Sequence, residues 1–299
     1  MTENFGKLEA SIADSIRLNS IMFLRRAAAE VIKHDDTQDS PFDREVGTVV
    51  TVLTQMSLEL ALASFLIKRD GIRIILENEE KFSDADIHER WLDNRLRTKR
   101  FEENKKYFKE KHRYLYEIFE GIVDNFQATR NKIVHFHFNF ADADLYDLKF
   151  EVTYVLIHVV SKLIFEDDTD LLSNMSSLLS DEVFLRLVKF PPYVYNVEKL
   201  ASENSRRVLG CPICHQRTFS DSELKCFACG YDDPFADLIT CRECDVRAVI
   251  YDHLNIDINK SVPALCLNCG ERCVAFNCAE CELLSTGSDY MDCEFCKSP

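Results

Sequence analysis

The chain has 299 residues, of which 46% are hydrophobic, and its formal net charge is −15. This apolar content is enough for about two folded domains and argues against intrinsic disorder. The negative charge argues against a protein that coats nucleic acid with its whole surface. The sequence shows neither a signal-peptide pattern nor an apolar run of about 20 residues. We therefore expect a cytoplasmic protein without a membrane span.

The part before residue 200 is expected to be all helical, because apolar residues recur in it with a period near 3.6. The second helix is apolar on several faces and stops at Gly71, so we expect it to be central. Ser83 and Asp86 resemble a capping box that opens a helix, and Pro191 with Pro192 should end the last one. The expected helices span residues 7–33, Pro41 to about Arg69, a short piece at 72–80, Phe101–Phe126, 144–165 and 170–190.

Three polar residues interrupt the apolar pattern after residue 126, namely Arg130, Asn131 and His135. On a helix Asn131 and His135 share a face, and the long side chain of Arg130 can fold back to them. An imidazole that titrates near neutrality, a charged planar guanidinium and an amide together suit phosphate chemistry, so these three are the candidate catalytic residues. The competing interpretation is a surface arginine and a core histidine. His137 has aromatic neighbours and is interpreted as a packed structural residue.

The stretch from Arg130 to His135, with four residues between them, resembles the R-x4-6-H motif of the HEPN superfamily, in which Asn commonly follows the Arg. The resemblance implies a HEPN-like helical bundle over residues 1–200 and a metal-independent endoribonuclease. His135 would act as general acid or base, Arg130 would stabilise the phosphorane charge and Asn131 would orient one of them. It further implies a homodimer that brings two motifs together, and a role as a toxin or antiviral defence effector. Some relatives carry a modifiable Tyr where this chain has His137, which argues against that form of regulation here.

Residues 95–113 carry nine Lys and Arg residues against three Glu, a local charge of +6. This stretch is the expected binding surface for the RNA backbone, and a solvated helix face is the alternative. The expected RNA-binding residues are Arg95, Arg97, Lys99, Arg100, Lys105, Lys106 and Lys109.

All 13 cysteines lie after residue 210, and twelve of them form six C-x-x-C pairs. Residues 198–207 are polar and are expected to link the helical domain to a second domain at 206–299. Pairing neighbouring C-x-x-C motifs gives three tandem zinc ribbons with three structural zinc ions and no catalytic metal, because four thiolates leave no position for water. Iron in place of zinc, and a crossed pairing in which the first and third motifs share a metal, stay open. The expected metal ligands are Cys211, Cys214, Cys226, Cys229, Cys241, Cys244, Cys266, Cys269, Cys278, Cys281, Cys293 and Cys296.

The second domain leaves one cysteine over and is itself acidic. Cys273 is expected to be a free thiol, with exchange for Cys269 or Cys266 as the alternative. From Arg206 onward there are 9 basic and 15 acidic residues, formally −6, so we expect the ribbons to bind a protein partner rather than RNA. Two other functions stay open: a non-catalytic RNA- or nucleotide-binding helical domain with a zinc-ribbon adaptor, and an adaptor whose helical half only dimerises.

Overall fold

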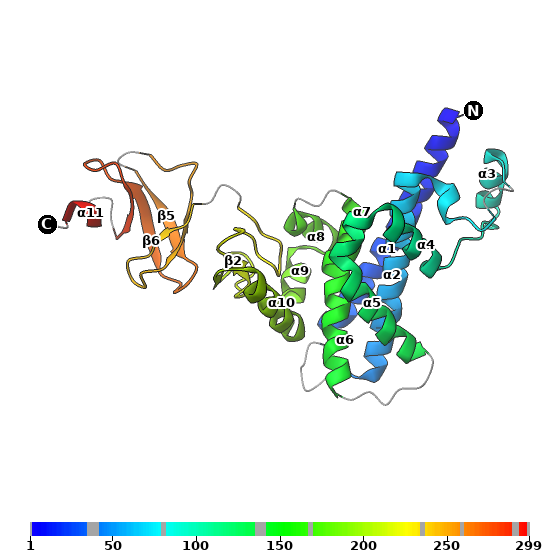
Figure 1. The fold of residues 1–299 in the computed structure, drawn as a ribbon, viewed down its shortest axis with the longest axis horizontal. Coiled ribbons are helices and arrows are strands. Elements are labelled where there is room, and N and C mark those ends of the chain that lie inside the picture. Colours follow the sequence, from blue (N-terminus) through cyan, green and yellow to red (C-terminus); the bar gives the residue numbers. More distant parts are fainter. Residues whose placement is uncertain are drawn as a thin grey trace. The chain divides into compact units, whose positions relative to one another are not determined.

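The computed structural model describes residues 2–34, 42–78, 82–134, 142–166, 170–233, 237–257, 260–288 and 293–297. The chain forms two compact units, Met1–Tyr193 and Val194–Pro299, the first helical and the second rich in strands (Figure 1). The helical elements are α1 (Thr2–Lys33), α2 (Arg44–Asp70), the 3₁₀ turn η1 (Ile72–Ile75), α3 (Asp84–Leu92), α4 (Phe101–Lys111), α5 (Arg113–Val134), α6 (Asp142–Tyr154), the π-helix η3 (Val155–Val160), α7 (Ser161–Phe165), α8 (Leu171–Leu179), α9 (Asp181–Leu187), α10 (Pro191–Asn204) and α11 (Glu294–Lys297).

Helices α1 and α2 pack along each other as an antiparallel pair. The hydroxyl of Ser57 donates to the carbonyl of Ser20 at 2.9 Å, and the hydroxyl of Ser64 donates to the carbonyl of Ala13 at 2.9 Å. Buried Ser20 returns a bond of 2.8 Å to the carbonyl of Ser57. Small hydroxyl side chains at these positions let the two backbones approach while the hydroxyls of Ser20, Ser57 and Ser64 keep partners.

The predicted central position of the second helix is confirmed. Buried residues cover most of the circumference of α2, which starts after the N-cap Asp43 and ends at Gly71. The φ of Gly71 is +90°, a conformation that favours glycine, so this residue ends the helix without strain. Within the described part of the chain, α2 is the helix whose length and composition would also allow a membrane crossing. Because 67% of its most apolar window is buried, it has the environment of a core helix.

Two of the predicted helices are each divided into two shorter helices, and a further helix begins at the two prolines. The helix expected at Phe101–Phe126 is divided into α4 and α5 at His112, whose Nε2 lies 2.7 Å from Oδ2 of Asp70. The segment expected at 170–190 is divided at Ser180, which caps α9 through its hydroxyl. Helix α9 ends at Leu187, before the two prolines, but it is not the last helix as expected. Pro191 opens α10, since the first position of a helix needs no N–H donor.

Two further expectations on the helices are confirmed, and the expected linker needs correction. The capping box of Ser83 and Asp86 is present at the start of α3. The segment expected to be helical at 144–165 is helical throughout, with a π-helix at its centre. The predicted linker at 198–207 is largely helix, because α10 continues to Asn204, and the division between the two units falls inside α10. The expected first turn at Pro41 lies outside the described residues.

The second unit contains two antiparallel sheets. Strands β1 (Val208–Leu209) and β2 (Phe219–Ser220) form the smaller one. In the larger sheet each strand pairs with its neighbour in sequence, and Thr286 Oγ1 donates to the carbonyl of Thr240 at 3.1 Å, so its two edge strands approach each other. The second and third cysteine groups therefore belong to one sheet. Its strands are β3 (Ile239–Thr240), β4 (Arg247–Tyr251), β5 (Ser261–Cys266), β6 (Arg272–Asn277) and β7 (Leu284–Gly287).

Candidate functional sites

Helix α5 carries the polar motif and is fixed to α2 by a buried amide contact. Phe126 is fully buried, and Gln127 beside it is only 5% exposed. The side-chain amide of Gln127 donates to the side-chain oxygen of Gln55, and the amide of Gln55 donates to a carboxylate oxygen of Glu59 at 2.5 Å. Because buried polar groups without partners are costly, this chain of hydrogen bonds fixes the rotation of α5 one turn before Arg130.

The structure brings Arg130 and Asn131 together at the end of α5. Nη1 of Arg130 donates to Oδ1 of Asn131 at 2.9 Å. Arg130 is half-buried and Asn131 is exposed, while Ile133 on the same turn packs into the core. His135, like His137, lies outside the described residues, and in the sequence it follows Val134, the last residue of α5. The guanidinium is thus held at the border between core and solvent, where a charged ligand can reach it.

A buried carboxyl from α6 contacts the same end of α5. Glu151 is 8% exposed, accepts a hydrogen bond from the hydroxyl of Thr129, and its Oε2 has no hydrogen-bond partner. Burial raises the pKa of Glu151 to about 7; repulsion from Asp147 adds to this rise, while the bond from Thr129 and the charge of Lys132 oppose it. Near neutral pH this carboxyl, bonded to Thr129 of α5, can therefore hold or release a proton.

Much of the basic stretch at 95–113 is paired with the chain's own acids. Lys105 lies 3.0 Å from Glu102 and 3.2 Å from Asp124, and Lys109 forms an ion pair with Glu120. Further basic groups are engaged in the same way: Arg95 pairs with Glu89 and Asp93, Arg113 pairs with Glu117, and Lys99 Nζ donates to the carbonyl of Ile74. An RNA phosphate would have to compete with these partners, so the role of this stretch, including Arg97, Arg100 and Lys106, stays a prediction.

The twelve paired cysteines fall into three groups of four thiols, as expected from pairing neighbouring motifs. Within each group all four sulfur atoms lie within 4.8 Å of one another. The closest sulfur pairs, such as Cys211 with Cys229 and Cys241 with Cys269, are 3.5–3.8 Å apart. A tetrahedral zinc site with metal–sulfur bonds of about 2.3 Å has edges of about 3.8 Å, whereas a disulfide needs about 2.05 Å. Each group could therefore hold one zinc ion, and its geometry does not fit disulfides.

The turn that follows the second cysteine of a pair is left-handed in five of the six motifs. Gly230 and Gly270 have φ values of +73° and +81°, which glycine adopts without strain. His215, Asp245 and Glu282 occupy the equivalent position with φ between 54° and 62°. Backbone amides also point at the sulfurs, as in the 3.4 Å bond from the amide of Ile213 to Cys211. These turns hold the thiols in place for a cation.

Hydrogen bonds favour the thiolate form of one cysteine in each cluster of the larger sheet, whereas burial raises the pKa of Cys241 and Cys266 in the second cluster. The side chain of Asn268 donates to the sulfur of Cys244 at 3.5 Å and lowers the pKa of that thiol to about 7. The backbone amides of Cys281 and Glu280 lower the pKa of Cys278 to about 7 as well. Since metals bind the thiolate, these donors prepare the clusters for a metal.

Cys273 lies outside the three clusters. It is on β6 opposite Ala264 of β5, and burial raises the pKa of its thiol. Among the described residues, Cys266 and Cys269 each belong to the second cluster with Cys241 and Cys244. Four ligands are thus present there without Cys273.

Glu151 and the Gln55–Gln127 pair were not predicted from the sequence. A local signal existed for Glu151, because it directly precedes the apolar run from Val152 and lies on the buried side of its helix. For the glutamine pair no local signal was available, since its members are 72 residues apart. Comparison with protein-family models, with curated proteins and with solved structures gave no match, so the geometry described above carries the functional argument.

Proposed function

We propose that this chain is a metal-independent endoribonuclease with its reacting groups at the end of α5. The observation that carries the proposal is the bond from Arg130 to Asn131, which holds a half-buried guanidinium at solvent, five positions before the motif ends at His135. A fixed guanidinium binds phosphate oxygens in a fork and stabilises charge that develops on them. The imidazole of His135, five positions further along the chain, would supply proton transfer near neutral pH.

In the proposed reaction the 2′-hydroxyl oxygen of RNA forms a bond to the adjacent phosphorus, and the bond from phosphorus to the 5′-oxygen breaks. His135 takes the proton of the 2′-hydroxyl or gives a proton to the leaving 5′-oxygen, and Arg130 binds the phosphorane oxygens. The products are a 2′,3′-cyclic phosphate and a 5′-hydroxyl. Two motifs meeting across a homodimer would supply both the acid and the base that one histidine cannot supply at once.

The three cysteine clusters have a structural role in this proposal. Their residues fit zinc, and four thiolates complete its preferred tetrahedral shell, so bound zinc would contribute folding energy to the second unit. The chemistry of the reaction is assigned to the helical unit.

The test is incubation of the purified full-length chain with single-stranded RNA in a buffer without Mg²⁺, followed by analysis of the product ends. Cleavage to a cyclic phosphate and a 5′-hydroxyl is expected, with losses of at least about 10²-fold for His135→Ala and for Arg130→Ala. Arg26→Ala is the matched control, because Arg26 is an exposed helical arginine outside both the motif and the basic stretch and pairs with Glu30. Products with a 5′-phosphate, or a strict need for Mg²⁺, would contradict the mechanism.

A further inference from the structure

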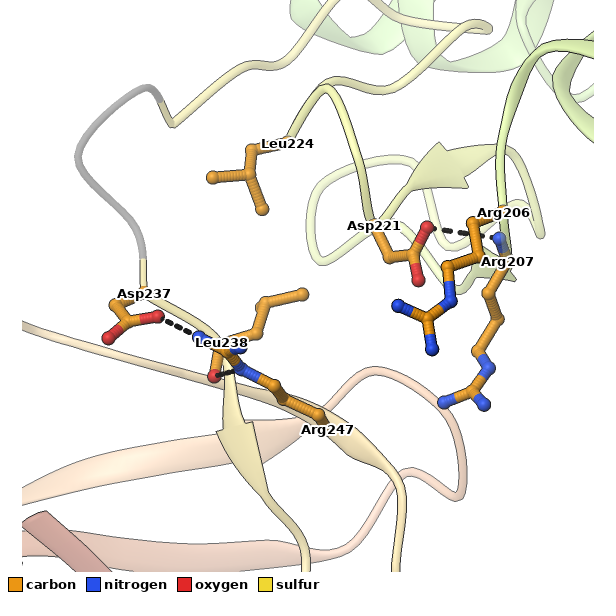
Figure 2. Close-up of a pocket in the computed structure, with 7 residues that line it drawn as sticks. All are labelled: Arg206, Arg207, Asp221, Leu224, Asp237, Leu238 and Arg247. Atoms are coloured by element: carbon orange, nitrogen blue, oxygen red, sulfur yellow. Dashed lines mark hydrogen bonds and ion pairs between the residues drawn. The ribbon is translucent and has the colours of Figure 1, made fainter.

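The second unit contains a small cavity where arginines gather in an otherwise acidic part of the chain. The cavity has a volume of about 260 Å³ and is lined by the segment between α10 and β1, the turn after β2, the residues just before β3 and the start of β4 (Figure 2). Three of the nine basic residues found after residue 205 line it. The lining residues are Arg206, Arg207, Asp221, Leu224, Asp237, Leu238 and Arg247.

The two acidic groups of the cavity are already engaged. A carboxylate oxygen of Asp221 accepts a 3.0 Å hydrogen bond from the backbone amide of Arg207. Asp237 accepts from Nη2 of Arg247 at 2.5 Å, and Nε of Arg247 donates to the carbonyl of Leu238 at 2.5 Å. These bonds fix Arg247 as one wall of the cavity and pair its charge with that of Asp237. Arg206 and Arg207 then face the single remaining carboxylate of Asp221, so the lining keeps a formal net charge of +1.

Arg206 and Arg207 carry the cavity's available charge. Both are exposed, and among the described residues neither guanidinium has a hydrogen bond or an ion pair. Figure 2 shows both side chains extending from the backbone in the same direction, toward the part of the cavity formed by Arg247. Two guanidinium groups offer planar forks of N–H donors that match phosphate oxygens.

We propose that this cavity binds a phosphodiester of single-stranded RNA, a substrate-holding role that rests on the proposed ribonuclease function. Its volume lies below the ~300 Å³ at which pockets for whole small molecules begin, so it suits one group of a longer chain rather than a free nucleotide. Leu224 and Leu238 add apolar wall for the sugar beside the phosphate. The acidic surroundings repel the rest of the backbone, which confines the contact to this position.

The binding test uses full-length protein and a fluorescein-labelled single-stranded RNA with 2′-O-methyl groups, which the proposed reaction cannot cleave. Fluorescence anisotropy measures the Kd over a series of salt concentrations. Replacing both arginines by alanine is expected to weaken binding at least about tenfold and to lower the salt dependence by about 0.7 in log–log slope, the value for one neutralised phosphate of a single strand. Replacing both by lysine retains the slope with intermediate affinity, because the charge stays and the fork is lost.

Arg217→Ala is the matched control, because Arg217 is an exposed arginine of the same small sheet region that does not line the cavity. Equal effects of Arg217→Ala and of the double alanine variant would overturn the proposal. Displacement of the labelled RNA by millimolar AMP would overturn the assignment to a backbone phosphodiester. If polyglutamate displaced the labelled RNA at a lower concentration than unlabelled RNA does, the cavity would be assigned to an acidic protein instead.

Cleavage of unmodified RNA separates this inference from the proposed function. If the chain cleaves RNA but the affinity for the modified strand is independent of Arg206 and Arg207, the cavity assignment fails and the ribonuclease stands. When no cleavage occurs but the affinity depends on both arginines, the ribonuclease fails and the binding site stands.

Discussion

The guanidinium of Arg130 donates from Nη1 to Oδ1 of its neighbour Asn131 at 2.9 Å. Adjacent residues on a helix point about 100° apart, so this contact requires the long arginine side chain to fold across the helix surface. The amide oxygen thereby fixes one edge of the guanidinium and leaves the other edge for a ligand. Asn131 acts in the proposed reaction by positioning Arg130.

Asn131→Ala should reduce RNA cleavage by about 10- to 100-fold, the effect of losing a hydrogen bond to a charged group. The loss should fall on kcat more than on KM, because Arg130 is proposed to bind charge that develops in the transition state. Asn131→Asp keeps an oxygen acceptor and should restore part of the rate. Asn125→Ala, an exposed asparagine earlier on α5, is the control, and equal rates for the two alanine variants would exclude a positioning role for Asn131.

Elemental analysis should find three zinc ions per chain. Cys211→Ser removes one ligand of the first cluster and should reduce the content to about two, whereas Cys273→Ser should keep three because Cys273 lies outside the clusters. Stripping the metal should unfold the second unit, since structural zinc contributes roughly 10–16 kcal/mol in zinc-finger peptides. A red protein that contains iron, or a content of one metal per chain, would contradict the assignment.

The cysteine clusters could be predicted from the sequence because their information is local. A C-x-x-C motif specifies a turn with two sulfurs on one side, and only the pairing of motifs requires the fold. The central helix was predictable for a similar reason, since apolar residues on several faces of α2 require burial on several faces.

Features that depend on contacts between distant segments could not be predicted. The interruption at His112 coincides with a contact to Asp70 from another helix, and the periodicity of residues 101–126 carries no sign of it. The position of Arg247 beside Arg206 and Arg207 depends on how two sheets pack, which their sequence spacing does not encode. The continuous sheet that joins the second and third clusters is likewise a property of strand pairing.

Gln127→Ala should destabilise the helical unit by about 1–3 kcal/mol, because it leaves the buried oxygen of Gln55 without its donor. The measurement is urea unfolding followed by circular dichroism at 222 nm in the zinc-loaded chain. Asn125→Ala, on the exposed side of α5, should change stability by less than about 0.5 kcal/mol. If both variants unfold at the same urea concentration as the wild type, the amide contact does not hold α5 in place.

Glu151 should make the stability of the helical unit depend on pH. Its pKa is raised by burial from 4.5 to about 7 in the folded chain, so between these values the folded state binds more protons than the unfolded state. Stability therefore falls as the pH rises from about 4.5, and the loss is complete above pH 7.

Glu151→Gln carries no ionisable group and should be more stable than the wild type at pH 8 by up to about 3 kcal/mol, at about 1.4 kcal/mol per pKa unit. Urea unfolding at pH 5, 6, 7 and 8 measures the difference, with Glu110→Gln as an exposed control. Parallel pH profiles for the wild type and Glu151→Gln would mean that Glu151 is ionised in the folded chain, and it could then hold no proton at neutral pH.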